Sequence, residues 1–324
     1  MKALVTGATG NVGGTVLDHL VAAGHDVTAT VRSDSGAAVI RGRGGRPVEA
    51  SLGDAPALMR AMEGSDVAFH VAGVNEFCLP DSAEMFATNV DGSANVIRSA
   101  LRAGVGKVVY TSSAVTIGEP AGSVGTETMA HRGWYLSEYE RSKVEAERTV
   151  AIEAEDLGVN VVSVNPASVQ GPGRVTGTAR LLLAFLQGRL RYLPDTRATI
   201  VDVDDCARGH LAAAEHGAKG ARYLLASATV STSDMATLLA SAAGVEISFR
   251  SLSPRVARMA GTVVGGAYRL VRKQAPVCSE MIRTMLHGHA FDGSRAEREL
   301  GITYTPIEET LERMVGWYRE QGLL

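Results

Sequence analysis

The sequence has few aromatic residues, few cysteines and no strong excess of charge. Aromatic residues make up 5% of its 324 residues, and the formal net charge is −3. A charge so close to neutrality argues against a partner nucleic acid. The three cysteines, Cys78, Cys206 and Cys278, lack metal-ligand spacing, and their odd number predicts no disulfide framework and a reducing, cytoplasmic location.

Long apolar runs are also missing. No run reaches the roughly 18 residues that would indicate a transmembrane helix, so we predict no membrane span. The chain passes from Met1 directly into a strand pattern, which predicts no signal peptide. Glycine, in contrast, is abundant, with 36 residues, and together with alanine and valine it suits close packing of helices on a sheet.

Short apolar runs alternate with helical patterns over the first half of the chain. The first run, residues 2–6, precedes a glycine-rich loop and then apolar residues at helical spacing up to Gly24. This alternation predicts an α/β fold with a doubly wound parallel sheet, whose ligands bind at the carboxyl ends of the strands. We expect a Rossmann dinucleotide-binding domain over residues 1–170, to which residues 199–230 return. The rest of residues 171–324 would form a smaller C-terminal, mainly substrate-binding domain.

The glycine-rich loop has the context of a dinucleotide fingerprint, because it follows a strand and opens a helix. Glycines there allow a tight turn and let a pyrophosphate approach the backbone at the helix N-terminus. The spacing is Gly-x-x-Gly-x-x-Gly rather than Gly-x-Gly-x-x-Gly. An ordinary strand-to-helix turn is therefore the alternative interpretation.

The second predicted strand, residues 27–31, is followed by Arg32 instead of the Asp or Glu that holds the ribose 2′-hydroxyl of NAD. A guanidinium at that position suits a 2′-phosphate. We therefore expect NADP, with NAD less favoured, although Asp34 lies close by in the sequence. Arg41, Arg43 and Arg46 follow, and a solvated loop is the alternative interpretation of these three arginines.

Tyr139 and Lys143 are four residues apart, so they share one face of a helix that Ser137 and Glu140 would begin as a capping box. A fixed ammonium beside a phenol favours the phenolate and lowers the pKa of the tyrosine. The pair is therefore a candidate proton donor. Tyr-x-x-x-Lys is common by chance, so two solvated residues on an amphipathic helix are the alternative.

Several motifs occur together in one order. They occupy residues 6–13, 70–73, 89–92, 108–114, 139–143 and 165–172, followed by 202–205 and 295–301. This order resembles the extended short-chain dehydrogenase/reductases, the NAD-dependent epimerase/dehydratase family. Within that family the chain looks most like the dihydroflavonol 4-reductase-like and 3β-hydroxysteroid dehydrogenase-like branch.

The resemblance implies an oxidoreductase in which Tyr139 is the general acid, Lys143 binds the nicotinamide ribose and Ser113 hydrogen-bonds the substrate oxygen. Lys143 would also lower the pKa of Tyr139. Ser112 is less favoured, because the family's serine directly precedes an alanine, and Asn89 completes the implied catalytic set. No metal site is implied. The implied cofactor-binding residues are Gly7, Thr9, Gly10, Asn11, Val12, Gly13, Arg32, Ser51, Leu52, Ala72, Gly73, Tyr139, Lys143, Pro166 and Val169.

Two departures from the family pattern bear on the ligands. Ser51 stands where relatives often have an Asp beside the adenine, so that contact is weaker or is made by Asp54. Ala198 stands where nucleotide-sugar epimerases carry an arginine that grips a diphosphate, and Arg197 is displaced by one position. We therefore favour a small hydrophobic ketone or aldehyde, or the matching alcohol. A sugar epimerase or dehydratase, and a dinucleotide sensor without catalysis, are the alternatives.

Apolar residues are expected to line the substrate site. The candidates are Phe77 and Leu79 in one loop and Leu181, Leu182, Leu183, Phe185 and Leu186 in a later helix. Residues 256–270 would form a lid helix over the substrate, with contact to a membrane as the alternative. Trp134 and Tyr135 fit either the core or the pocket, and His70 is interpreted as a strand residue rather than a base.

A homodimer is also implied, because relatives pair the two helices that begin near Asn89 and Ser137. Apolar positions on these helices that could form the interface are Val96, Ala100, Val144 and Val150.

Overall fold

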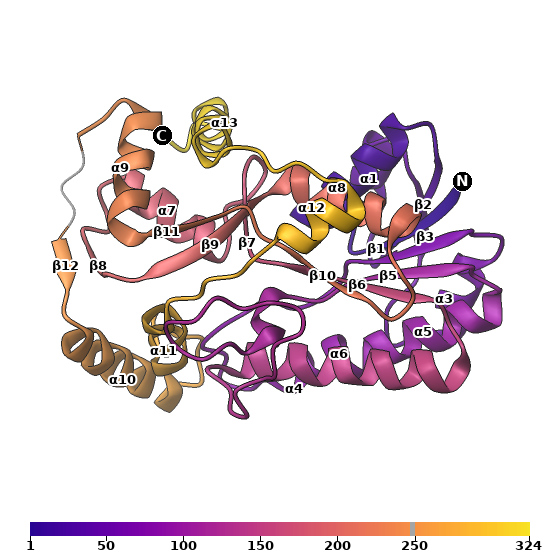
Figure 1. Cartoon of the computed structure of the whole chain (residues 1–324), viewed down its shortest axis with the longest axis horizontal. Helices are drawn as coiled ribbons and strands as arrows, with labels where there is room; N and C mark the ends of the chain where they lie inside the picture. The colour runs from indigo at the N-terminus through magenta and orange to yellow at the C-terminus, as the bar shows by residue number, and fades with distance from the viewer. Residues whose placement is uncertain (247–249) are drawn as a thin grey trace.

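A seven-stranded parallel sheet forms the centre of the protein (Figure 1). The computed structural model describes residues 1–246 and 250–324. The strand order is β10-β6-β5-β4-β1-β2-β3, which is the doubly wound arrangement that the sequence predicts. The strands are β1 (Lys2–Thr6), β2 (Asp26–Val31), β3 (Arg46–Glu49), β4 (Val67–His70), β5 (Lys107–Thr111), β6 (Val161–Pro166) and β10 (Arg222–Leu225).

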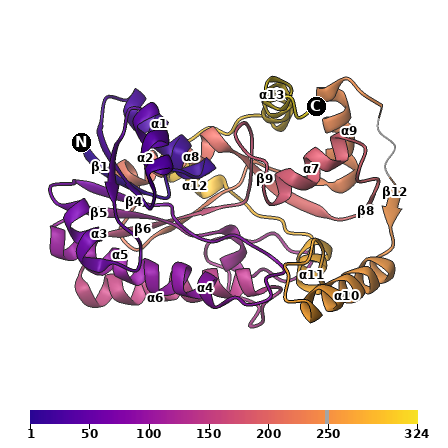
Figure 2. The same cartoon turned by 180° about the vertical axis from the view of Figure 1, so that it is seen from behind.

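Helices cover both faces of this sheet (Figure 2). One face carries α1 (Asn11–Ala22), α2 (Asp34–Gly42), α8 (Val203–His216) and α12 (Ser294–Leu300). The other carries α3 (Ala55–Met62), α5 (Gly92–Ala103) and α6 (Glu138–Leu157). The short helices α4 (Ala83–Phe86), η1 (Ala87–Asp91) and η2 (Ala114–Ile117) lie in the connections at the carboxyl ends of the strands.

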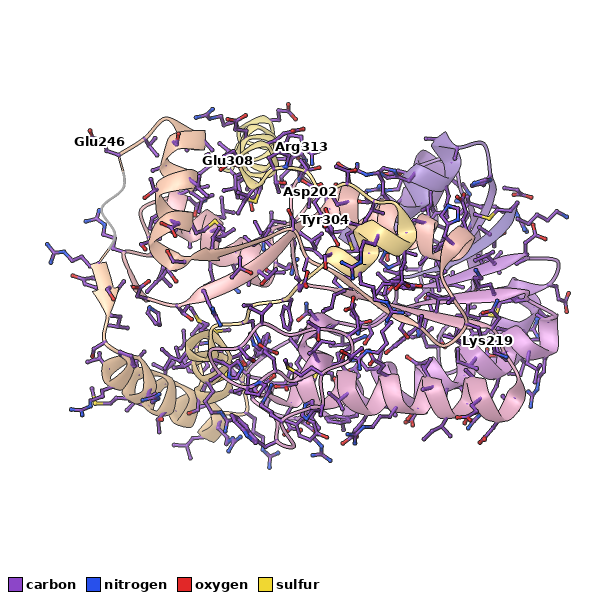
Figure 3. All side chains as sticks on the ribbon, viewed as in Figure 1. Asp202, Lys219, Glu246, Tyr304, Glu308 and Arg313 are labelled. Carbon is purple, nitrogen blue, oxygen red and sulfur yellow. A yellow bond between two sulfur atoms is a disulfide. The ribbon has the colours of Figure 1, made fainter. Side chains whose placement is uncertain are left out.

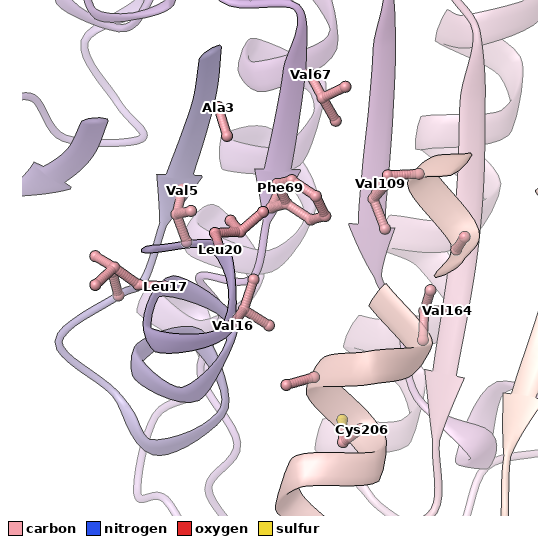
Figure 4. Packing of buried hydrophobic residues seen from close by; sticks show 14 of the residues in the cluster. Ala3, Val5, Val16, Leu17, Leu20, Val67, Phe69, Val109, Val164 and Cys206 are labelled. Atoms are coloured by element: carbon pink, nitrogen blue, oxygen red, sulfur yellow. The ribbon is translucent and has the colours of Figure 1, made fainter. Parts of the chain in front are cut away.

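The core on the first face is made by alternate residues of the buried strands and by one stripe of α1. Val5 and Phe69 project from neighbouring strands against Val16, Leu17 and Leu20, and all five side chains are fully buried (Figure 4). The stripe has helical spacing, so the apolar pattern of the sequence is sufficient to orient α1. The N-terminus of α1 is thereby directed at the carboxyl end of β1.

A smaller unit follows the main sheet. Strands β7 (Ser168–Gln170), β9 (Arg197–Asp202) and β11 (Ala228–Ser231) form a three-stranded sheet, and β8 (Tyr192–Pro194) pairs with β12 (Arg250–Leu252). The accompanying helices are α7 (Thr178–Leu186), α9 (Thr232–Ala243), α10 (Pro254–Leu270), α11 (Ser279–His287) and α13 (Ile307–Glu320). The guanidinium of Arg313 lies beside Asp202 and bonds it, which ties α13 to the end of β9 (Figure 3).

Residues 199–230 divide between the two sheets. β10 joins the main sheet and α8 covers it, whereas β9 and β11 pair with each other in the small sheet. The domain boundaries themselves remain a prediction. Among the described residues, no helix combines the length and the apolar character that crossing a bilayer requires.

The cysteine prediction is wrong. Cys78, in the loop after β4, forms a disulfide with Cys278, which directly precedes α11. The odd number of cysteines was misleading because the third, Cys206, is buried and free on α8. The partners are 200 residues apart, so no local spacing reveals the pair. The prediction of a reducing, cytoplasmic location therefore loses the support it drew from the cysteines.

The residues predicted for a dimer interface need correction. The proposed interface residues Val96, Ala100, Val144 and Val150 are buried within the chain, because α5 and α6 use them to pack inside the protein. The homodimer itself remains a prediction.

Helix α7 also uses its apolar residues for packing. Phe185 is buried in a core with α9 and α13, and Leu182, Leu183 and Leu186 are partly buried and pack against that core. Their contact with a substrate stays a prediction. The predicted lid role of helix α10 stays a prediction. The helix packs on α11 and exposes its other face.

We predict that the disulfide stabilises the fold by about 2–4 kcal/mol, because it closes a long loop in the unfolded chain. Reduction of the wild-type protein should lower its free energy of unfolding by that amount in urea titrations. The Cys278→Ser variant should start at the lower value and be insensitive to reductant. Equal stability of the oxidised and reduced wild-type protein would contradict the prediction.

Candidate functional site

The glycine-rich loop passes so close to neighbouring backbone that side chains have no room. Gly7 has a φ of +74°, and a Cβ there would lie 2.6 Å from the Ala72 nitrogen. A Cβ on Gly13 would lie 2.3 Å from the Gly7 carbonyl oxygen. Gly10 is the N-cap of α1 and offers no side-chain cap, so the first N–H groups of the helix are available to an anionic ligand. This cradle fits a dinucleotide pyrophosphate.

Three further residues of the loop set its position. The Asn11 amide donates to the Pro172 carbonyl at 2.9 Å, which joins the loop to the segment after β7. Thr9 lies near Gly36 of α2, where a Cβ would be 3.3 Å from its methyl group, and Val12 packs against the core. The structure therefore brings together the loop residues that the sequence predicts.

Arg32 directly follows β2 and is exposed. Within residues 1–246 and 250–324 it makes no side-chain hydrogen bond or ion pair. Two of the arginines that follow it in the sequence already have partners. Arg43 forms an ion pair with Asp18, and Arg46 donates a hydrogen bond to the Thr28 hydroxyl at 2.6 Å. These two arginines lie at the end of α2 and in β3, not in a loop. Arg32 is therefore the better placed guanidinium for a group at the end of β2.

Ser51 and Leu52 follow β3. Ser51 is exposed, and Leu52 packs against Gly92, where an added Cβ would come within 2.9 Å of it. Asp54 caps α3 by accepting from the Ala57 N–H at 3.0 Å. Asp54 is the residue predicted to contact the adenine in place of Ser51. Capping of α3 engages one of its two carboxylate oxygens.

Asn89 organises the backbone after β4. Its amide accepts from the Val74 N–H at 2.8 Å and donates to the Val74 carbonyl at 3.0 Å and to Ser142 at 3.0 Å. Gly73 lies beside it, and a Cβ there would be 3.2 Å from the Asn89 amide oxygen and 4.0 Å from the Lys143 nitrogen. The backbone of Ala72 and Gly73 thus lies between the glycine-rich loop and Lys143, and no side chain projects from Gly73 toward Lys143.

Lys143 is buried on α6 and points to the carboxyl end of β5. Its ammonium donates to the Thr111 carbonyl at 2.9 Å and to the Tyr110 hydroxyl at 3.4 Å. Burial lowers the pKa of Lys143 to about 8, and the Glu147 carboxylate opposes that shift. A lysine held in this way is fixed in place and close to losing its proton at mildly alkaline pH.

Tyr139 lies one turn earlier on the same face of α6, with 9% of its surface exposed. Burial raises the pKa of its phenol, while a hydrogen bond with Ser113 and the charge of Arg174 lower it. Ser113 and Arg174 are therefore groups that favour the phenolate, and the expected effect of Lys143 stays a prediction. The ring of Phe77 lies 5.7 Å from that of Tyr139, so the phenol has an apolar neighbour.

The two adjacent serines have different surroundings. Ser112 donates to the Glu147 carboxylate, which also accepts from Thr116 at 3.0 Å and Asn165 at 2.6 Å. Ser113 instead begins η2 and lies near Tyr139, where it lowers the pKa of the phenol. The structure thus places Ser113 with Tyr139 and Lys143, and Ser112 in a buried network that holds α6 to the sheet.

Arg174 is a site residue that the sequence analysis missed. It follows the Gly171-Pro172-Gly173 breaker, and its guanidinium donates to the carbonyl of Val169 and to that of Thr176. Burial lowers the pKa of Arg174, and the nearby Tyr139 opposes that shift. Val169 and Pro166 are both buried at this edge of the sheet. In the sequence, the only indication of a role for Arg174 was its position after a turn near the ends of the strands.

A second charged cluster lies in the loop after η2. The buried Glu119 carboxylate bonds His289 at 2.6 Å, and His287 donates to the Glu119 carbonyl at 3.0 Å. Burial opposes ionisation of Glu119, but hydrogen bonds from the two histidines prevail and lower its pKa to about 2. These residues are close enough to one another to hold a metal ion, but the Glu119 carboxylate is already engaged by the two histidines.

The remaining candidates are structural or exposed. His70 is fully buried and bonds Thr6 at 2.8 Å and Ser93 at 2.9 Å, and burial lowers its pKa to about 3. It therefore acts as a neutral bridge within the core. Trp134 is 54% exposed and therefore lies outside the core, with the Arg132 guanidinium over its ring.

Arg197 is committed to backbone groups. It donates to the Gly288 carbonyl and to the Ser123 carbonyl, each at 3.0 Å. A guanidinium used in this way is poorly placed to grip a diphosphate. Ala198, the next residue, offers no charged group in its place.

Comparison with known proteins gives this site a context. Residues 3–226 match the model of the NAD dependent epimerase/dehydratase family. Sterol demethylase protein B of Methylococcus capsulatus is 29% identical, with 100% of each chain covered. A candidate dihydroflavonol 4-reductase of Synechocystis is 28% identical over 98% of this chain and 94% of that protein.

Two other relatives bear on the chemistry. The 2-alkyl-3-oxoalkanoate reductase of Shewanella oneidensis is 28% identical over 96% of this chain and 85% of its own. The crystal structure of a nucleoside-diphosphate-sugar epimerase from Pseudomonas aeruginosa superposes with a TM-score of 0.82 at 25% identity, covering 100% of this chain and 99% of that one. Both a reductase and an epimerase are therefore among the proteins that this chain resembles.

Proposed function

Because the chain belongs to the NAD dependent epimerase/dehydratase family, we propose that it reduces a hydrophobic ketone or aldehyde, or oxidises the matching alcohol, with NADP. The proposal rests chiefly on the surroundings of Tyr139, which is buried, in contact with Ser113 and next to the ring of Phe77. Its relatives that are named as reductases support the same chemistry.

The chain's own groups have complementary tasks in this reaction. The dinucleotide supplies the hydride, so the protein needs to position the carbonyl and supply a proton. Tyr139 donates that proton to the substrate oxygen, and Ser113 hydrogen-bonds the same oxygen as negative charge develops. Lys143, which Thr111 holds beside Gly73, would bind the nicotinamide ribose.

The cofactor preference is argued from Arg32. A 2′-phosphate at the end of β2 would meet a guanidinium that has no partner within the described residues, and Arg pairs with phosphate through charge-assisted hydrogen bonds. We therefore propose NADP over NAD.

A sugar epimerase or dehydratase that uses the same Tyr139 is the second candidate. The structural likeness to a nucleoside-diphosphate-sugar epimerase favours it. The engagement of Arg197 with two backbone carbonyls, and Ala198 beside it, argue against it. A diphosphate without a guanidinium partner loses a charge-assisted bond of about 1.5–3 kcal/mol.

Replacing Tyr139 by Phe should lower kcat roughly 10²–10⁴-fold, because the variant keeps the aromatic ring but lacks the hydroxyl group that donates the proton. Dinucleotide affinity, measured by titration calorimetry, should change by only a few-fold. Ser113→Ala should also lose turnover, and Ser112→Ala is the matched control, with lower stability but retained turnover. Near-normal kcat in the Tyr139→Phe protein would rule out Tyr139 as the acid.

Replacing Arg174 by Gln should move the titration of Tyr139 to higher pH, because the positive charge favours the phenolate. In the oxidative direction the base must be deprotonated, so the rise of kcat with pH should shift upward. Arg174→Lys keeps the charge and should largely restore the profile. The exposed Arg180→Gln is the control, and identical profiles for Arg174→Gln and wild type would contradict the assignment.

Replacing Arg32 by Ala should weaken NADP binding roughly tenfold to a hundredfold while NAD binding changes little, because only the phosphate contact is lost. The exposed Arg60→Ala on α3 controls for the change of net charge. Equal affinity of the wild-type protein for NADP and NAD would contradict the proposed preference for NADP.

A further inference from the structure

The outer face of α10 is an exposed apolar stripe. Val256, Met259, Val263 and Leu270 are 44%, 63%, 65% and 87% exposed. Their spacing of three, four and seven residues places them on one side of the helix. Scattered surface apolar residues need no explanation, but large ones aligned along one helix mark an interaction surface.

The opposite face of α10 is fixed to α11. Ala257 and Gly261 are buried there, and a Cβ on Gly261 would lie 2.9 Å from Ile282 and 3.1 Å from the Cys278 carbonyl oxygen. A Cβ on Gly265 would lie 3.0 Å from the Cys278 side chain. This stripe of small residues seats the helix tightly, so the apolar face stays directed outward.

Cations, and no acids, accompany the apolar stripe. Between Pro254 and Lys273 the charged residues are all basic and all exposed: Arg255, Arg258, Arg269, Arg272 and Lys273. None of the five forms an ion pair with any described residue. Helical spacing places the first three along one border of the stripe. The chain as a whole has a net charge of −3, so this segment is a local excess of positive charge.

We propose that α10 is a membrane-interfacial helix that binds the surface of an anionic lipid bilayer. Val256, Met259, Val263 and Leu270 would enter the boundary between headgroups and acyl chains, while the arginines bind lipid phosphates. The helix lies on the bilayer and does not cross it. Charge complementarity selects lipid over a second copy of this chain, whose α10 would bring the same positive charges together.

The position of α10 connects this surface to the candidate site. Cys278, against which α10 packs, is joined by the disulfide to Cys78, next to Phe77. Glu280 of α11 accepts from the Cys78 N–H at 2.6 Å and from the Glu138 N–H at 3.0 Å. Both views show α10 and α11 together at the end of the molecule away from α3 (Figures 1 and 2). If the proposed function holds, a bilayer-dissolved ketone would enter on this side.

Co-sedimentation of the full chain with vesicles tests the proposal. The protein should pellet with phosphatidylcholine vesicles that contain phosphatidylglycerol, weakly with phosphatidylcholine alone, and less as salt is raised. Replacing Met259, Val263 and Leu270 by Ser should abolish pelleting. The matched control replaces Val39, Leu101 and Ile152, which are exposed apolar residues on other helices, and should pellet like wild type.

A charge variant separates the two contributions. Changing Arg255, Arg258 and Arg269 to Gln should weaken binding to anionic vesicles about a hundredfold, and changing Arg60, Arg102 and Arg180 should have a small effect. Wild-type protein that stays in the supernatant, or an equal loss in variant and control, overturns the proposal. A shift of the wild-type protein to dimers that only the apolar α10 variant reverses, without vesicle binding, also overturns it, in favour of a second copy.

Turnover with a water-soluble ketone and NADPH should be unchanged in all four variants. Wild-type protein that turns over the ketone but binds no vesicles refutes only the lipid surface, and wild-type protein that binds vesicles but shows no turnover refutes only the proposed function.

Discussion

The ammonium of Lys143 is held at the carboxyl end of β5, where it donates to the Thr111 carbonyl at 2.9 Å. The buried residues Ala146, Val150 and Ala154 of α6 pack into the core on the same side and fix the rotation of the helix about its axis. Helical periodicity then places Tyr139 one turn before Lys143 and Glu147 one turn after it, all on one face. Ser113 lies near Tyr139 and lowers the pKa of its phenol. The Glu147 carboxylate accepts hydrogen bonds from Ser112 and Asn165. The candidate site is thus a consequence of one helix face packed against the ends of two strands.

Burial of these groups is costly and has consequences for their chemistry. It lowers the pKa of Lys143 to about 8 and raises the pKa of Tyr139. Both shifts favour the neutral forms in the protein alone. The charge of Arg174, and the hydrogen bond with Ser113, oppose the shift of Tyr139. Ser113 and Arg174 are therefore the groups that move the pKa of the phenol toward the range in which a tyrosine is an effective proton donor.

Local patterns were sufficient to predict the main sheet and the residues at its carboxyl edge. A strand, a glycine-rich loop and an amphipathic helix occupy consecutive residues, so their geometry follows from sequence alone. Features that depend on distant partners were not predictable. The disulfide joins residues 200 positions apart, and the apolar face of α7 could have lined a pocket or joined a core. Arg174 lies in an irregular loop whose path no periodicity specifies.

Cofactor consumption during turnover tests the central claim most directly. The protein would be incubated with NADPH and a panel of aryl, alicyclic and long-chain ketones, and separately with UDP-glucose and UDP-galactose. A Tyr139 site built for hydrophobic carbonyls should consume NADPH in proportion to the alcohol formed and leave both UDP-sugars unchanged. Interconversion of the UDP-sugars without net loss of dinucleotide, together with inertness toward every ketone, would contradict it.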